Sequence, residues 1–292
     1  MGRTGHPYFL KIILELGKVR ISFPVALSAL TGYALQTGQI GLRGFLLAAG
    51  VFLVSCSSGA INHLQERHTD ALMPRTKSRP LPSGKISLNS ALGVAATYFL
   101  SGSLILLWFF PALAWLAAVV TLLSYNAFYT PLKKVTAFAV VPGSLVGALP
   151  PYIGWLAAGG SISDPVIFWV AVFFFIGQIP HFWLLLLMFG HEYKLAGYPS
   201  LNDIFSENQI KRLTFTWILA TIASAMVIAL HVLKGETVMF LLILYVFYLL
   251  FSLSVQLLVR KDLQVRPAFF KLNFLYLFMM IALITDSILH RA

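Results

Sequence analysis

Long apolar runs alternate with short polar segments along almost the whole chain. An apolar run of about 20 residues can cross a hydrocarbon core roughly 30 Å thick as a helix. Residues 1–20, with an amphipathic stretch from 8 to 20, are expected to lie at the membrane interface. We expect an all-α membrane protein in a single domain (1–292), a bundle around a central cavity. Its nine predicted transmembrane helices cover residues 21–37, 44–62, 89–110, 112–129, 139–158, 166–190, 213–233, 237–259 and 269–289.

The composition excludes several classes of protein. Apolar residues make up 59% of the 292 residues and charged residues 11%, whereas soluble domains have roughly 45–50% and about 25%. Disordered chains are poor in apolar residues, so disorder is excluded as well. The single cysteine, Cys56, has no partner in the chain for a disulfide. The net charge of +11 does not indicate nucleic acid as a partner, because the basic residues lie in short loops between apolar runs.

Lysines and arginines favour one side of the predicted bundle. Cytoplasmic loops of membrane proteins carry an excess of these residues. The N-terminus and the loops after the second, fourth, sixth and eighth predicted helices hold 18 of them, and the opposite side holds three. An even number of helices would lose this asymmetry. No cleavable signal peptide or Arg/Ser-rich presequence is recognised, which favours a bacterial inner membrane with the N-terminus in the cytoplasm.

The two longest connections, residues 62–88 and 191–212, hold most of the unusual polar residues, and we expect both to be cytoplasmic active-site loops. The second predicted helix has no breaker before Pro74, so Asn62, Glu66 and Asp70 follow one another at a spacing of four. Each step of four residues turns only about 40° around a helix, which puts the three side chains on one face. Two neighbouring carboxylates repel and favour a cation between them. Hard oxygen donors in a partly hydrated site favour Mg²⁺.

A dense run of cations, Arg75, Lys77 and Arg79, follows these donors. Carboxylates followed by such cations suit a diphosphate bridged to the protein by a metal ion, with arginine and lysine on the outer oxygens. The alternative is a helix end at the membrane surface, followed by an ordinary positively charged cytoplasmic loop.

The donors and cations together resemble a known family. Asn62-x3-Glu66-x3-Asp70-x2-Met73-x-Arg75-Thr76-x2-Arg79-Pro80-Leu81 is similar to the first motif of the protoheme IX farnesyltransferases, a family of UbiA-type intramembrane prenyltransferases. The resemblance spans roughly residues 15 to 205. Further similar segments, in the family's order, are residues 18–21, 129–136, 147–155, 178–183 and 192–199.

The chain departs from the family pattern at a few positions. Val19 replaces a proline, Phe138 replaces a common asparagine, and Glu66 and Glu192 stand where aspartate is usual. The second polar loop lacks the double carboxylate of the quinone prenyltransferases. A site for one metal ion is therefore better supported than a site for two.

The resemblance implies the reaction and the substrates. It implies transfer of farnesyl from farnesyl diphosphate to a vinyl group of haem B, with addition of water, to give haem O. The lipid bilayer and a downstream haem-modifying oxidase are the other partners it implies. The metal ligands would be Asn62, Glu66, Asp70 and Glu192. The residues that would bind diphosphate are Arg75, Arg79, Lys133, Lys134 and Lys194.

Two tyrosines and one histidine in the matching segments have more than one possible role. Tyr129 and Tyr193 either donate hydrogen bonds to the diphosphate or belong to the tyrosine belt of the interface. His181 follows Pro180 inside a predicted span, where an ionisable group is costly and usually faces the protein interior. It would ligate the haem iron, act as a base, or bond to a carbonyl that Pro180 leaves free.

Lys18 and Arg20 precede the first predicted span. They would either meet the haem propionates at the surface or act as ordinary topology anchors.

Two other functions remain as alternatives. The first keeps the prenyl diphosphate site but prenylates an aromatic quinone precursor, such as 4-hydroxybenzoate or a naphthoate. The second is an ion-coupled transporter, which predicts coupling charges near the membrane midplane and an internal repeat. The acidic residues instead lie at one membrane boundary, and no convincing repeat is found.

Overall fold

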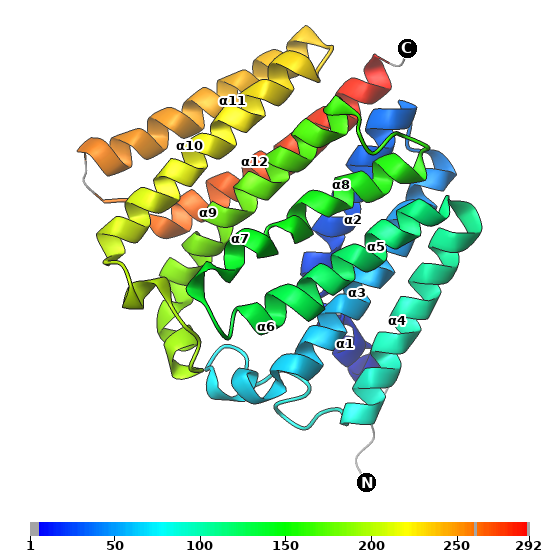
Figure 1. Cartoon of the computed structure of the whole chain (residues 1–292), viewed down its shortest axis with the longest axis vertical. Helices are drawn as coiled ribbons and strands as arrows, with labels where there is room; N and C mark the ends of the chain where they lie inside the picture. Colours follow the sequence, from blue (N-terminus) through cyan, green and yellow to red (C-terminus); the bar gives the residue numbers. More distant parts are fainter. Residues whose placement is uncertain (1–5, 260–261, 291–292) are drawn as a thin grey trace.

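The computed structural model describes residues 6–259 and 262–290. Helices run side by side through the molecule, and its regular elements in these two ranges are all helical (Figure 1). Arg3, Arg260, Lys261 and Arg291, which entered the charge count above, lie outside the described residues. The α-helices are α1 His6–Leu16, α2 Val19–Thr37, α3 Gly41–Leu72, α4 Leu88–Phe109, α5 Ala112–Leu123, α6 Thr130–Leu132, α7 Val140–Gly143, α8 Leu145–Ala157, α9 Pro165–Leu195, α10 Glu207–His231, α11 Glu236–Ser254 and α12 Val265–Leu289. The short π and 3₁₀ helices are η1 Ser124–Tyr129, η2 Ala137–Ala139, η3 Leu201–Asp203 and η4 Val255–Val259.

The all-α membrane fold is confirmed, but the count of nine spans is not. Among the described residues, eight helical stretches are long and apolar enough to cross a membrane. The predicted span that is not confirmed is the first, residues 21–37, which corresponds to α2: this segment is helical as expected but is not one of the eight. Arg20, Pro24 and several hydroxyl residues reduce the apolar character of α2. Because α2 packs between α3, α8 and α12, much of its surface meets protein and does not need to be as apolar as a lipid-facing helix.

Small residues bring α2 and α8 unusually close together. A Cβ at Gly154 would lie 1.7 Å from the carbonyl oxygen of Ala29, and one at Gly32 would lie 1.9 Å from the carbonyl oxygen of Pro151. Close backbone approach through small residues is how helices pack inside membranes, where lipid gives no hydrophobic drive for association. In addition, α2 packs against α12 and α8 packs against α9. These two contacts join the N-terminal helices of the bundle to the C-terminal ones.

Two helices extend beyond the apolar runs from which their spans were predicted. The second span was expected to end at residue 62 and the sixth at 190, but α3 has 32 residues and α9 has 31. At 1.5 Å per residue each is more than about 45 Å long and exceeds a hydrocarbon core of roughly 30 Å. The polar ends of both helices, together with α6, lie at the same end of the bundle (Figure 1). This arrangement brings the two long connections together.

The remaining segments anchor the bundle at its two ends. In α1, Ile12 and Leu16 are buried while Phe9 and Leu10 are exposed, as expected for an amphipathic helix at the surface. At the opposite end, the buried carboxylate of Asp286 accepts hydrogen bonds from the backbone nitrogens of residues 234 and 235, at 2.9 and 2.7 Å. Asp286 therefore ties α12 to the connection between α10 and α11.

Candidate active site

The three oxygen donors of α3 face the interior of the protein. Asn62 and Asp70 are fully buried, and Glu66 is 5% exposed. The helix continues past them because the first residue that breaks it, Pro74, comes after Asp70. The sequence prediction that they share one helical face holds, and that face points into protein.

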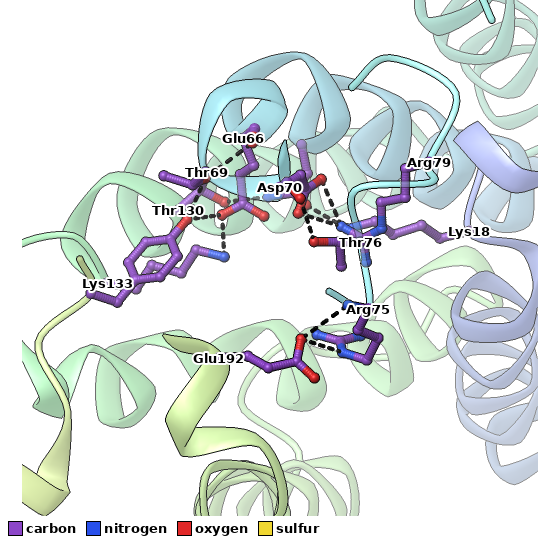
Figure 2. A network of polar contacts seen from close by, with 12 residues as sticks. Lys18, Glu66, Thr69, Asp70, Arg75, Thr76, Arg79, Thr130, Lys133 and Glu192 are labelled. Carbon is purple, nitrogen blue, oxygen red and sulfur yellow. Dashed lines mark hydrogen bonds and ion pairs between the residues drawn. The ribbon is translucent and has the colours of Figure 1, made fainter. Parts of the chain in front are cut away.

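Each donor is paired with a cation from a different segment, and Figure 2 shows Glu66 and Asp70 among these cations. Lys133 forms an ion pair with Glu66. The Nη1 atom of Arg79 lies 2.8 Å from both carboxylate oxygens of Asp70. The ammonium of Lys18 donates to the amide oxygen of Asn62. The loop after α3, the segment after α6 and the turn before α2 therefore meet at one stripe of α3, which is formed by Asn62, Glu66 and Asp70.

Aromatic rings hold Lys133 in position. Its ammonium lies 5.6 Å from the ring centroid of Tyr129 and 5.5 Å from that of Tyr198. Tyr129 ends the π helix η1, and its ring also packs against Phe182 at 5.6 Å. π-helical turns inside longer helices are frequent at functional sites. The rings give Lys133 cation–π contacts on two sides and separate it from bulk water.

The second polar loop, residues 191–212, closes over this stripe. The hydroxyl of Tyr198 donates to Glu66 Oε1 at 3.2 Å and lies 2.9 Å from Thr69 Oγ1. Burial raises the pKa of the Tyr198 hydroxyl well above its usual range, and the negative charge of Glu66 adds to this effect. Tyr198 therefore remains a hydrogen-bond donor at neutral pH.

A second tie between the two loops joins Arg75 to Glu192. The backbone nitrogen of Arg75 donates to Glu192 Oε2 at 3.3 Å, and its Nε lies 3.9 Å from the same oxygen. The guanidinium also lies 5.0 Å from the ring centroid of Phe189. Both side chains keep contact with solvent, at 43% and 21% exposure, so the pair contributes little to stability on its own.

Lys18 lies at the turn before α2, where its surroundings perturb its ammonium strongly. Its backbone adopts a left-handed conformation, with φ 46°, at the turn between α1 and α2. Burial, together with repulsion from Arg79, lowers the pKa of the Lys18 ammonium to about 7, and the carboxylate of Glu66 acts in the opposite direction. Lys18 was expected at the surface, against haem propionates or as a topology anchor, and instead it lies against Asn62.

Several predicted site residues lie apart from this cluster. Lys134 and Arg20 are exposed at the surface. Lys194 is 77% exposed and lies 3.5 Å from Asp203. Glu192, predicted as a metal ligand, pairs with Arg75 and not with the donors of α3. Tyr193, by contrast, lies beside the cluster: it packs against Tyr198, with ring centroids 5.7 Å apart, and lines a pocket of about 50 Å³ together with Lys133.

His181 does not bond to a carbonyl freed by Pro180, one of the roles considered above. Its Nδ1 lies 3.0 Å from the side-chain oxygen of Asn273 in α12. In the same turn of α9, the carbonyl of Gly177 accepts a hydrogen bond from the hydroxyl of Tyr276. Asn273 was missed at the sequence level, although an amide inside an apolar run is itself a signal of a polar contact.

Other polar residues of the site were also missed. Thr130 accepts a 3.1 Å hydrogen bond from Asn62, and the amide nitrogen of Asn126 donates to Gln65 at 3.2 Å and to the Ser58 carbonyl at 3.0 Å. These contacts fix η1 and the start of α6 against α3. Polar side chains within apolar runs were the available signal, but their partners are more than 60 residues away in the chain.

The donor set of α3 fits a hard divalent cation. In the part of the chain that the structure describes, no group of three His, Cys, Asp or Glu residues is arranged to hold a metal ion. The available set is two carboxylates and an amide oxygen, all facing cations already. Mg²⁺ typically uses only one or two carboxylates and completes its shell with water and substrate phosphate. The chemistry of these donors therefore suits Mg²⁺ delivered with a diphosphate.

The chain is similar in sequence and in fold to known proteins. The model of the UbiA prenyltransferase family matches residues 25–280. A protoheme IX farnesyltransferase of Oleidesulfovibrio alaskensis is 38% identical over 190 residues, 65% of this chain and 67% of the relative. One from Nitratidesulfovibrio vulgaris is 34% identical over 219 residues, 74% of this chain and 76% of the relative.

Solved structures share the fold at low sequence identity. A UbiA homologue from Archaeoglobus fulgidus, bound to DMAPP and Mg²⁺, superposes with a TM-score of 0.70 at 15% identity, covering 94% of this chain and 99% of that one. The apo structure of a UbiA homologue from Aeropyrum pernix gives a TM-score of 0.71 at 16% identity, covering 92% and 98%. These likenesses establish the architecture.

Proposed function

Because the chain belongs to the UbiA prenyltransferase family, we propose that it transfers farnesyl from farnesyl diphosphate to a vinyl group of haem B, with addition of water, to give haem O. Relatives named protoheme IX farnesyltransferase support this choice of donor and acceptor. The observation that carries the proposal is the meeting of Asn62, Glu66 and Asp70 with Lys18, Arg79 and Lys133.

The bond changes of the reaction balance without a further co-reactant. The bond between farnesyl C1 and the diphosphate oxygen breaks, and both electrons leave with the diphosphate. Farnesyl C1 then bonds to the terminal carbon of the vinyl group. A water oxygen captures the positive charge left on the carbon next to the porphyrin, and its surplus proton passes to a second water molecule. The products are haem O and free diphosphate.

The residues of the stripe bind the leaving group. Glu66, Asp70 and Asn62 would hold Mg²⁺, which stabilises the negative charge that grows on the diphosphate. Lys133 and Arg79 now neutralise Glu66 and Asp70. When diphosphate enters, both side chains turn to its oxygens, because arginine and lysine prefer phosphate oxygens that carry more charge. The cations are therefore in place before the bond breaks.

The aromatic pocket beside Lys133 protects the reacting carbon. It is lined by Tyr129, Phe182, Trp183, Tyr193 and Tyr198, among others, and its volume of about 50 Å³ is far smaller than a farnesyl chain or a porphyrin. Substrate entry therefore requires the second polar loop to move away from α3. Its return excludes water, which would otherwise capture the allylic cation before the vinyl group does.

The proposed location is the inner membrane of a bacterium. The protein is an integral membrane protein, and the excess of lysine and arginine at the site end supports a cytoplasmic orientation of the N-terminus and of both polar loops. Farnesyl diphosphate, which is charged, would then reach the site from the cytoplasm, while haem and the farnesyl chain occupy the membrane.

Purified protein in detergent, incubated with haem B, farnesyl diphosphate and Mg²⁺, tests the proposal. The expected product is haem whose mass has increased by one farnesyl group plus one hydroxyl group. 4-Hydroxybenzoate and a naphthoate serve as competing acceptors. Prenylation of either one with haem unchanged would assign the chain to the quinone branch, and no prenylation of any acceptor would overturn the proposal.

A further inference from the structure

His181 and Asn273 form a polar contact between α9 and α12, inside the bundle. The His181 Nδ1 atom lies 3.0 Å from Asn273 Oδ1. An amide oxygen can only accept a hydrogen bond, so Nδ1 must carry the hydrogen. In a neutral imidazole the other nitrogen, Nε2, then holds the lone pair. The contact therefore selects one tautomer of His181.

The surroundings leave Nε2 free. In the described chain it forms no hydrogen bond, and it is not completely buried. The rings of Phe269, Phe182 and Tyr276 lie 5.0, 5.7 and 6.3 Å from the His181 ring. The hydroxyl of Tyr276 is engaged by the Gly177 carbonyl, so it does not compete for Nε2. One basic nitrogen among aromatic rings suits a flat apolar macrocycle with a metal at its centre.

The histidine is also connected to the diphosphate site. Phe182, which contacts His181, packs on Tyr129, and the Tyr129 ring lies under the ammonium of Lys133. His181 thus stands on the apolar side of the same aromatic wall whose polar side meets Glu66 through Lys133. A porphyrin held at His181 would be next to the place where the farnesyl cation forms.

We propose that Asn273 is a positioning residue for the acceptor: it holds the Nδ1 hydrogen of His181, so that Nε2 ligates the iron of haem B. The inference rests on the proposed function and adds the means by which haem is held. Residues that orient a metal-bound histidine typically contribute 10- to 100-fold to metal affinity. Loss of the Asn273 oxygen therefore raises the Kd of ferric haem about 10- to 100-fold.

Titration of ferric haem B into the purified protein tests this role, with the Soret band as the readout. Wild type is expected to give the spectrum of a histidine-ligated haem. Asn273→Leu weakens binding and shifts the band, whereas Asn273→Asp keeps both, because a carboxylate oxygen still accepts from Nδ1. His181→Ala loses the spectrum and regains it when imidazole is added. His191→Ala is the matched control, since His191 is exposed on the same helix and its loss leaves the spectrum unchanged.

Iron-free protoporphyrin IX separates ligation from a role of His181 as a base. A ligand role predicts that Asn273→Leu and His181→Ala bind this porphyrin as wild type does. Weakened binding of both porphyrins to the same extent would overturn iron ligation, as would an unchanged ferric haem spectrum in His181→Ala. Thermal melting of Asn273→Asp and Asn273→Leu detects misfolding, and the Asp variant carries the test if the Leu variant unfolds.

Failure of this inference can be told from failure of the proposed function. If wild type farnesylates haem and His181→Ala has an unchanged spectrum, only the role of Asn273 and His181 is wrong. If wild type neither binds haem with a histidine spectrum nor farnesylates it, both are wrong.

Discussion

Tyr198 and Glu66 meet through a 3.2 Å hydrogen bond, although 132 residues separate them in the chain. Tyr198 belongs to the second polar loop, and Glu66 belongs to the oxygen stripe of α3. The same hydroxyl contacts Thr69, and the same ring covers the ammonium of Lys133. One side chain therefore couples closure of the loop to the position of a proposed metal ligand and of its counterion.

We predict that Tyr198→Phe lowers kcat/KM for farnesyl diphosphate about 10- to 100-fold, since a hydrogen bond to a charged group contributes roughly 1.5–3 kcal/mol. The ring remains, so Lys133 keeps its cation–π contact and the fold is unaffected. Initial rates of haem O formation measure the effect. Tyr248→Phe, on the exposed surface of α11, is the control for loss of a tyrosine hydroxyl. Equal rates for Tyr198→Phe and wild type would show that loop closure does not act through this bond.

The carboxylates of α3 give a sharper test. Glu66→Gln and Asp70→Asn keep the size of each side chain but remove the charge that attracts Mg²⁺, so each is expected to lose at least 100-fold in turnover. The matched control is Glu207→Gln, because Glu207 is 70% exposed at the start of α10. Rates at several Mg²⁺ concentrations, with thermal melting to check folding, are the measurements. Full magnesium-dependent activity in both α3 variants would remove the metal assignment.

The local parts of this site were predictable and the long-range parts were not. The absence of a breaker before Pro74 and the spacing of four between Asn62, Glu66 and Asp70 depend only on helix geometry, and the structure has both features. The approach of Tyr198 to Glu66 depends on how two loops pack, which no periodicity encodes. The predicted count of nine spans is not confirmed for a related reason: hydropathy detects helices that face lipid, and α2 lies largely against protein.

Lys18 predicts a pH dependence of stability. The pKa of its ammonium is about 7 in the folded protein and 10.5 in the absence of the fold, so the unfolded chain binds the proton more tightly. The contribution of Lys18 to stability is therefore least favourable below pH 7 and improves as pH rises from 7 to about 10. The Tm of wild type relative to Lys18→Met should rise between pH 6.5 and pH 9.

The measurement is thermal melting in detergent at both pH values. Taking the difference between the two proteins removes the contributions of all groups that they share. Lys134→Met, which removes an exposed lysine, is the control and should show no such trend relative to wild type. A constant or falling difference for Lys18→Met would mean that Lys18 keeps its charge throughout, held by Glu66 and Asp70.

The close contact of α2 with α8 predicts the most damaging small substitution in the bundle. In Gly154→Ala the new Cβ would overlap the carbonyl oxygen of Ala29, 1.7 Å away, and backbone atoms cannot move aside as a flexible side chain can. Adding a carbon atom to a well-packed core typically costs about 1–3 kcal/mol. The helix that must shift, α2, carries Lys18 at its N-terminal end. We expect Gly154→Ala to lower the Tm and to reduce turnover with it, because α2 shifts relative to α3.

Gly93→Ala in α4 is the matched control, since nothing lies within 4 Å of its added Cβ and alanine favours the helix. The measurement is the Tm of each variant. If the Tm of Gly154→Ala equals or exceeds that of Gly93→Ala, α2 and α8 are not held at this distance in the membrane.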